Sequence, residues 1–195
     1  MTSRVLAITG RPGIGKTSLV LAIAEKARSL GCRVGGVVTP EVRDASGLRW
    51  GFRVRDLGTG LEHILASVSS TGPRVGSYRL EVGADEFLSS AIERALSESD
   101  LLIIDEIGPM ELSLSSFRAL VIKLLGRPPL PTAVTFHYRL RSSEPSIYIL
   151  LMRGKVIELT EFNRGSVRSS VDDLTRWLID EACDDKRGEG APLHT

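Results

Sequence analysis

A run of nine residues near the start of the chain, GRPGIGKTS at positions 10–18, constrains the fold more than any other segment. It matches G-x-x-x-x-G-K-[ST], in which glycines allow a tight turn whose successive N–H groups converge on one anion. Lys16 adds a flexible positive charge for the β- and γ-phosphates of a nucleotide, and the Thr17 hydroxyl can ligate the accompanying Mg²⁺. The candidate nucleotide-binding residues of this loop are Gly10, Arg11, Pro12, Gly13, Ile14, Gly15, Lys16, Thr17 and Ser18.

The segments on either side of the loop fit this interpretation. Residues 4–9 (RVLAIT) predict a buried strand, and residues 17–30 predict a helix with one apolar face that ends at Gly31. This order matters because the N-terminus of the helix supplies further unpaired amides and the positive end of a dipole. The alternative, a chance glycine-rich turn, explains neither flank. The sequence therefore predicts a phosphate-binding loop, or P-loop.

A second cluster lies at Asp105 and Glu106, directly after the apolar residues 101–104 (LLII), which predict a buried strand. Ligands of open α/β sheets bind beyond the carboxyl ends of the strands, so Asp105 is expected to join Thr17 as a ligand of Mg²⁺. Glu106 is the candidate general base, because a carboxylate beside the γ-phosphate can orient a water molecule and accept its proton. With Lys16 it forms the candidate catalytic pair. The alternative is that the two acids merely end a strand.

The order of the other predicted elements indicates an α/β fold. Predicted strands at 33–38, 132–136 and 156–160 and helices at 85–97, 116–125, 146–152 and 171–183 indicate the three-layer sandwich of P-loop NTPases. The predicted strand at 132–136 follows the Asp105 (Walker B) strand after one helix. This order is typical of the P-loop class in which an extra strand lies between the P-loop strand and the Walker B strand. Residues 49–57 alternate strictly and, with residues 62–68 and 78–82, predict an antiparallel β-meander inserted into the mostly parallel sheet.

Several polar residues near the predicted site have two interpretations each. Thr135 and His137, at the tip of the extra strand, are candidates to sense the γ-phosphate, although His137 could equally be structural. Glu111 could hold a water near Mg²⁺ or begin a helix. Four arginines are candidates for an arginine finger or are ordinary surface residues: Arg43, Arg74, Arg139 and Arg141.

Length and charge narrow the class of protein. The 195 residues indicate one domain, expected over residues 1–183, with the polar residues 184–195 as a disordered tail. A net charge of +1 argues against a dedicated nucleic-acid or membrane-surface protein. The sequence shows no membrane-length apolar run and no signal peptide before the first strand, so we expect a cytoplasmic protein. Cys32 and Cys183 lack metal-ligand spacing and are expected as two thiols, although a disulfide stays open.

Side-chain amides are scarce in this chain. The chain has no glutamine and one asparagine, Asn163, with 20 arginines against 5 lysines. Scarce thermolabile amides indicate a thermophilic source, whereas the arginine excess could also reflect a GC-rich genome. We expect Asn163, which follows the last strand, to contact a nucleobase edge with its carboxamide while Arg164 stacks on the base. The alternative is a turn residue that closes the loop before Gly165.

Five further stretches give the chain a family resemblance: GGVVTPEVR (35–43), GFRVRDL (51–57), GPRVGSY (72–78), DEIGPMEL (105–112) and TEFNR (160–164). With the P-loop, they resemble the small P-loop nucleoside-triphosphatases first described in thermophiles, which are related to the human cancer-related nucleoside-triphosphatase. The resemblance implies slow, Mg²⁺-dependent hydrolysis of ATP, GTP, CTP and UTP with little base preference. The family pattern has a small aliphatic residue in place of Phe136 and commonly a polar residue in place of Phe162. These two differences bear on how the base is held.

The sequence thus predicts an enzyme that hydrolyses nucleoside triphosphates to the diphosphate and phosphate. One rival is a nucleotide or small-molecule kinase that uses the same loop. Against it, only residues 139–141 resemble an arginine-rich lid, and Glu106 would promote wasteful hydrolysis. The other rival is a binding module that nucleotide hydrolysis switches, whose protein partner the sequence does not identify.

Overall fold

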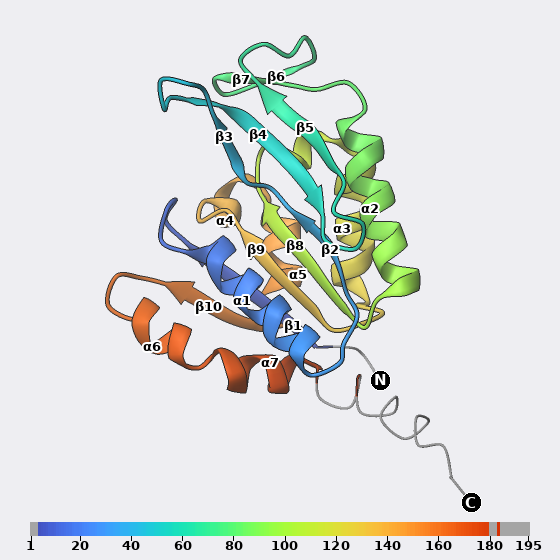
Figure 1. Cartoon of the computed structure of the whole chain (residues 1–195), viewed down its shortest axis with the longest axis vertical. Coiled ribbons are helices and arrows are strands. Elements are labelled where there is room, and N and C mark those ends of the chain that lie inside the picture. Colours follow the sequence, from blue (N-terminus) through green and yellow to red (C-terminus); the bar gives the residue numbers. More distant parts are fainter. Residues whose placement is uncertain (1–3, 180–182, 184–195) are drawn as a thin grey trace, which may run out of the picture.

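One mixed sheet of ten strands runs through the part of the chain that the computed structural model describes, residues 4–179 and 183 (Figure 1). Five parallel strands form one half, in the order β10 (Lys155–Leu159), β1 (Val5–Gly10), β9 (Thr132–Phe136), β8 (Leu101–Ile107) and β2 (Val34–Val38). The antiparallel half continues with β4 (Arg49–Asp56), β5 (Glu62–Ser67), β7 (Tyr78–Leu80) and β6 (Arg74–Val75), and β3 (Glu41–Arg43) pairs with β4. The predicted meander is therefore confirmed.

The extra strand β9 lies where the sequence places it, between β1 and β8. Ile8 of β1 pairs with Thr135, and Ile104 of β8 pairs with Val134, so β9 aligns the two neighbouring strands. All three are parallel, and their carboxyl ends meet at one edge of the sheet. The P-loop and the pair Asp105 and Glu106 are thereby brought to the same edge.

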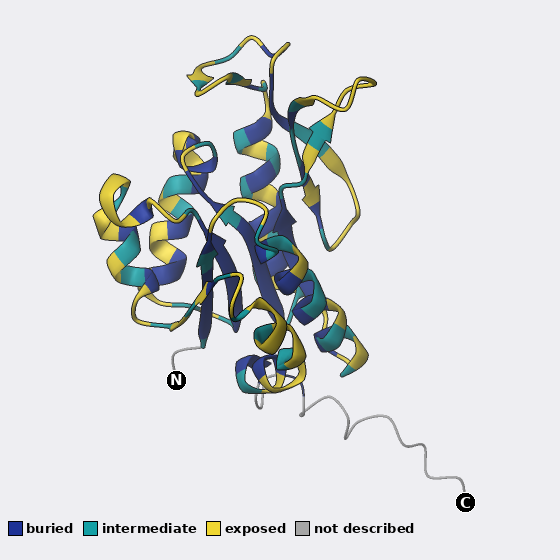
Figure 2. Cartoon of the chain, turned by 90° about the vertical axis from the view of Figure 1, so that its left-hand side faces the viewer, coloured by how far each residue is buried: buried dark blue, intermediate teal, exposed yellow. Residues whose placement is uncertain are grey.

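Helices cover both faces of the parallel half. On one face, α1 (Lys16–Ser29) and α7 (Val171–Ile179) share a core with Leu6 and Ile8 of β1. On the other, α2 (Ala84–Glu98), α3 (Ser115–Gly126) and α5 (Pro145–Leu151) pack with Ala7 and with Leu102 and Ile104 of β8. Successive side chains of a strand point to opposite faces, which explains this division. Burial on both faces explains why the parallel strands are almost continuously apolar (Figure 2).

Short elements complete the fold. The 3-10 helix η1 (Glu111–Ser113) follows β8, α4 (Leu140–Ser143) precedes α5, and α6 (Arg164–Ser169) joins β10 to α7. The sequence analysis missed β3, β6, α4 and α6. Each has at most six residues, too few for an apolar period to show.

The expectation of two free thiols was wrong. Cys32 and Cys183 form a disulfide, with their Cα atoms 5.5 Å apart across a sequence separation of 151 residues. The helix α7 packs against α1, and Cys183 lies in the same apolar cluster as Cys32, in the turn between α1 and β2. This proximity depends on tertiary packing, so the spacing of the two cysteines in the sequence could not show it.

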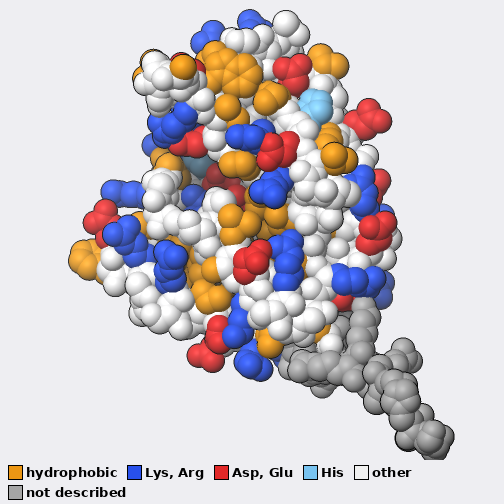
Figure 3. Space-filling view, viewed as in Figure 1, with side chains coloured by type: hydrophobic (Ala, Val, Ile, Leu, Met, Phe, Trp, Pro, Cys, Tyr) orange, Lys and Arg blue, Asp and Glu red, His pale blue; other side chains and the backbone are white. Residues whose placement is uncertain are grey.

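The predicted disordered tail, residues 184–195, lies outside the described residues. Among the helices that the structure describes, none is long and apolar enough to cross a bilayer. Acidic and basic side chains are interspersed over the face shown in Figure 3.

Candidate active site

The P-loop joins β1 to α1 and takes its shape from three glycines. Gly10, Gly13 and Gly15 have φ values of +145°, +78° and +107°, which side chains rarely tolerate. A Cβ at Gly10 would also lie 2.6 Å from the Leu159 carbonyl oxygen of the neighbouring β10. No side chain caps α1, so the N–H groups of its first turn are left for an anion.

Lys16, the first residue of α1, is buried against the end of the sheet. Its Nζ donates a hydrogen bond to the Gly10 carbonyl oxygen at 3.2 Å. The same ammonium lies 3.6 Å from Glu106 Oε1. The lysine therefore connects the P-loop with the acidic end of β8.

Asp105 is the most tightly held acid of the site. Thr17 Oγ1 donates to its Oδ2 at 2.9 Å, and Thr135 Oγ1 donates to its Oδ1 at 2.5 Å. A third hydroxyl, on Thr39, donates to the Asp105 backbone carbonyl at 2.7 Å. Burial raises the pKa of Asp105, while the two hydroxyls and the charge of Lys16 oppose that rise. A cation beside this carboxylate would favour its ionised form.

These oxygen atoms fit Mg²⁺, which prefers hard oxygen ligands and usually takes only one or two from protein. The Thr17 hydroxyl and the Asp105 carboxylate are adjacent, as their hydrogen bond shows. Among the described residues no group of three or more His, Cys, Asp and Glu could hold a metal ion. The remaining ligands would come from water and the nucleotide phosphates.

Glu106 and Glu111 form a second acidic pair, and Gly108 lies between them. Glu106 Oε1 is enclosed without a hydrogen-bond partner, and burial raises the pKa of Glu106 against the opposing charge of Lys16. Glu111 is buried, which raises its pKa to about 8, and the nearby charge of Glu106 adds to that effect. A Cβ at Gly108 would lie 3.0 Å from Glu111 Oε2 and 3.8 Å from Glu106 Cγ. A side chain at position 108 would therefore press on the Glu111 carboxylate and contact Glu106.

The structure gives different positions to the two candidate γ-phosphate sensors. Thr135 is fully buried and its hydroxyl is engaged by Asp105, so it orients the acid. His137 is partly buried, and its Nδ1 accepts a hydrogen bond from the Arg139 backbone N–H at 3.3 Å, which leaves the proton on Nε2. Burial lowers the pKa of His137, as do the charges of Lys16 and Arg139, so the ring is neutral at pH 7.

The carboxamide of Asn163 forms hydrogen bonds within its own loop. Its Oδ1 accepts from the Thr160 backbone N–H at 2.8 Å, and its Nδ2 donates to the Glu158 carbonyl at 2.9 Å. These bonds favour the turn alternative, although the φ of −109° shows that no left-handed residue is needed. Arg164, the first residue of α6, is exposed.

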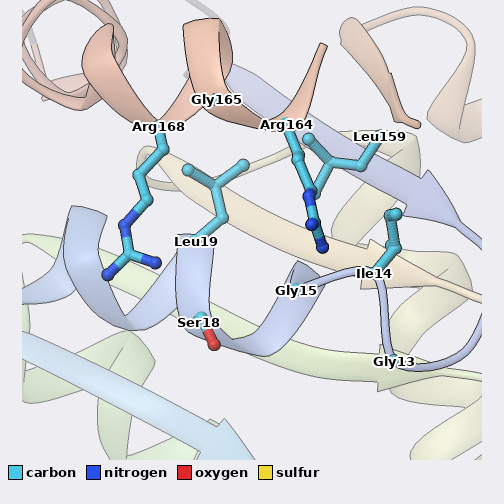
Figure 4. Close-up of a pocket in the computed structure, with 9 residues that line it drawn as sticks. All are labelled: Gly13, Ile14, Gly15, Ser18, Leu19, Leu159, Arg164, Gly165 and Arg168. Carbon is cyan, nitrogen blue, oxygen red and sulfur yellow. The ribbon is translucent and has the colours of Figure 1, made fainter. Parts of the chain in front are cut away.

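Two hollows flank Arg164 beside the P-loop. One, of about 310 Å³, lies between the P-loop, the first turn of α1 and α6 (Figure 4). The other, of about 520 Å³, lies between residues 11–14 of the P-loop and residues 158–162. The fold thus brings the predicted residues of the P-loop and Arg164 together. The burial of Glu111 beside Glu106 was not predicted, and the DEIGPMEL motif was the one signal in the sequence that pointed to Glu111.

Comparison with known proteins decides the family. The model of the family described as NTPase matches residues 5–171. The chain belongs to this NTPase family. This membership confirms both the predicted resemblance and the predicted P-loop fold.

Individual relatives of this NTPase agree with that assignment. It is 48% identical over 158 residues to nucleoside-triphosphatase THEP1 of Thermofilum pendens, covering 80% of this chain and 85% of the relative. The THEP1 of Archaeoglobus fulgidus is 39% identical over 174 residues, covering 89% and 98%.

Two solved structures share the fold of this NTPase. The crystal structure of THEP1 from the hyperthermophile Aquifex aeolicus matches with a TM-score of 0.73 at 33% identity, covering 88% of this chain and 98% of that one. The solution structure of a human cancer-related nucleoside triphosphatase matches with a TM-score of 0.69 at 30% identity, covering 90% and 97%.

Proposed function

We propose that this NTPase hydrolyses nucleoside triphosphates to the diphosphate and phosphate. The observation that carries the proposal is the meeting of Thr17 and Asp105, 88 positions apart, at a hydrogen bond of 2.9 Å beside Lys16 and Glu106. The relatives named as nucleoside-triphosphatases support it. The domain that does this chemistry comprises residues 1–183.

The binding step follows from the P-loop. Backbone N–H groups of residues 13–17 bind the phosphates, and the Lys16 ammonium leaves its contacts with Gly10 and Glu106 for the β- and γ-phosphate oxygens. Thr17 and Asp105 would hold Mg²⁺, which when bound neutralises charge on those oxygens. Thr135 keeps the Asp105 carboxylate oriented for this role.

Glu106 is our candidate for the general base. Its buried Oε1, which has no hydrogen-bond partner, can accept a hydrogen bond from a water molecule and then the proton. The Lys16 ammonium, 3.6 Å from this oxygen, favours the ionised carboxylate. Glu111 lies behind it across Gly108 and, with a pKa of about 8, is mostly protonated at pH 7. Hydrolysis measured in Glu106→Gln and in Glu111→Gln therefore shows which of the two carboxylates takes the proton.

The proposal extends to the substrates, the rate and the place of the base. The substrates are ATP, GTP, CTP and UTP with little base preference, turnover is slow, and the base lies near Asn163 and Arg164. We do not expect nucleic acid as a partner, because the net charge is only +1. The protein is cytoplasmic, a compartment in which proteins of hyperthermophiles can carry disulfides.

A phosphate-release assay over the four nucleotides tests the proposal. Wild-type protein with Mg²⁺ is expected to release phosphate from all four, and Lys16→Ala to release almost none. The assay is repeated with nucleosides as phosphoryl acceptors. Phosphorylated acceptor in place of free phosphate would identify a kinase and contradict the proposal.

A further inference from the structure

The 310 Å³ hollow beside the P-loop has an unusual set of side chains. Its walls combine an apolar surface with two guanidinium groups and a single hydroxyl (Figure 4). The side chains that define this chemistry are Ile14, Leu19, Leu159, Arg164, Arg168 and Ser18. None of them is a carboxylate or an amide, the groups that read amino protons on the edges of bases.

The two arginines come from the short helix α6. Arg164 and Arg168 are four positions apart and therefore lie on the same face of the helix. Figure 4 shows both side chains extending from α6 toward α1. Within residues 4–179 and 183, neither forms a salt bridge or donates a side-chain hydrogen bond, and both are exposed. Two cations are thus held over the hollow with their donors available.

The hollow is continuous with the phosphate site. Gly13 and Gly15 of the P-loop line it, as does Ser18, the residue after the candidate Mg²⁺ ligand Thr17. A nucleotide whose β- and γ-phosphates lie on the P-loop extends its sugar and base away from the γ-phosphate. The hollow between α1 and α6 adjoins the P-loop at Ser18 and is a space that this other end of the nucleotide can enter.

We propose that this hollow holds the nucleoside part of the substrate and that Arg168, together with Arg164, binds the base by stacking and by donating hydrogen bonds. The proposal rests on the proposed function and adds Arg168 as the residue that makes binding indifferent to the base. All four bases carry a π face and ring or carbonyl acceptors, so a guanidinium suits each of them. The one side-chain amide of the chain, on Asn163, already bonds Thr160 and Glu158 within its own turn.

Binding measurements separate the base from the phosphates. Titration calorimetry uses Mg²⁺ complexes of the β,γ-imido analogues of ATP, GTP, CTP and UTP, and Mg²⁺ tripolyphosphate as a probe without sugar or base. Arg168→Ala is expected to weaken binding of all four analogues by about five-fold, the size of one cation–π contact, and to leave tripolyphosphate unchanged. Arg168→Lys, which keeps the charge and loses the planar group, is expected to weaken them nearly as much.

Arg176→Ala on α7 is the matched control, because it removes an exposed arginine outside the hollow. An equal loss of tripolyphosphate affinity in Arg168→Ala, full binding in Arg168→Lys, or weakening confined to one base would overturn the proposal. Wild-type protein that fails to bind tripolyphosphate would instead contradict the proposed function. Because position 168 is exposed on a short helix, melting curves are expected to show all three variants folded.

Discussion

The parallel and antiparallel halves of the sheet are built differently. The central parallel strands β1, β9 and β8 are buried almost throughout, whereas β4 of the meander mixes exposed, half-buried and buried positions (Figure 2). The P-loop follows β1 of the parallel half, and Asp105 and Glu106 lie in β8, so these residues meet at the shared carboxyl edge of the parallel strands. The meander contributes exposed ion pairs such as Arg49 with Glu41 and Arg53 with Glu62. Chemistry is thus expected to depend on one half of a continuous sheet.

The largest expected effect comes from Lys16→Ala. Losing this ammonium removes charge stabilisation of the γ-phosphate in the transition state, and we expect turnover to fall by at least ~10³-fold. Arg49→Ala in the meander is the control and is expected to change turnover by less than about two-fold, since exposed ion pairs contribute little. Phosphate release measured on both folded variants makes the comparison. Equal losses in the two would show that the meander shares in the chemistry.

A second effect concerns stability. The scarcity of Asn and Gln predicts a melting temperature above roughly 75 °C.

The disulfide closes a long loop between Cys32 and Cys183, so Cys183→Ser is expected to lower the melting temperature by about 10 °C. Wild-type protein in reductant serves as the matched control and should melt with the variant. A melting temperature near 50 °C for the oxidised wild-type protein would show that the scarcity of Asn and Gln reflects genomic drift and not adaptation to heat.

A third effect is a pH dependence from Glu111. Its folded-state pKa of about 8 exceeds the ordinary 4.5, so the folded state binds this proton more tightly than the unfolded state. The free energy of unfolding should therefore fall as pH rises from about 4.5 to about 8, by an amount of the order of a few kcal/mol. Urea unfolding at pH 5 and pH 8 measures this fall in wild type and in Glu111→Gln, which has no carboxyl to titrate. Parallel pH profiles for the two proteins would show that Glu111 is not the source.

The smallest effect is expected from Asn163→Ala. If the carboxamide contributes to the nucleoside site, KM rises several-fold for all nucleotides while kcat hardly changes. If it serves only the turn that bonds Thr160 and Glu158, the melting temperature falls and KM stays unchanged. Steady-state kinetics with ATP and UTP, paired with thermal melts, distinguish the two roles.

These regions also differ in how far the sequence predicted them. The P-loop and the strand before Asp105 are local patterns, in which glycine spacing and a run of apolar residues carry the information. The position of β9 between β1 and β8 followed from element order alone. The Cys32–Cys183 disulfide depends on tertiary packing, whereas the approach of Glu111 to Glu106 depends on the turn between β8 and η1. The residues of α6 (RGSVRS) have no apolar period that would mark a helix.

The most direct test of the account is Glu106→Gln, with Glu111→Gln as the matched variant. The amide keeps the shape of the side chain and cannot accept a proton, so Glu106→Gln is expected to bind Mg²⁺·ATP normally and to lose single-turnover hydrolysis. Glu111→Gln should retain the chemical step. Wild-type hydrolysis in a Glu106→Gln protein that binds nucleotide normally, with loss of hydrolysis in Glu111→Gln, would contradict the assignment and make Glu111 the base.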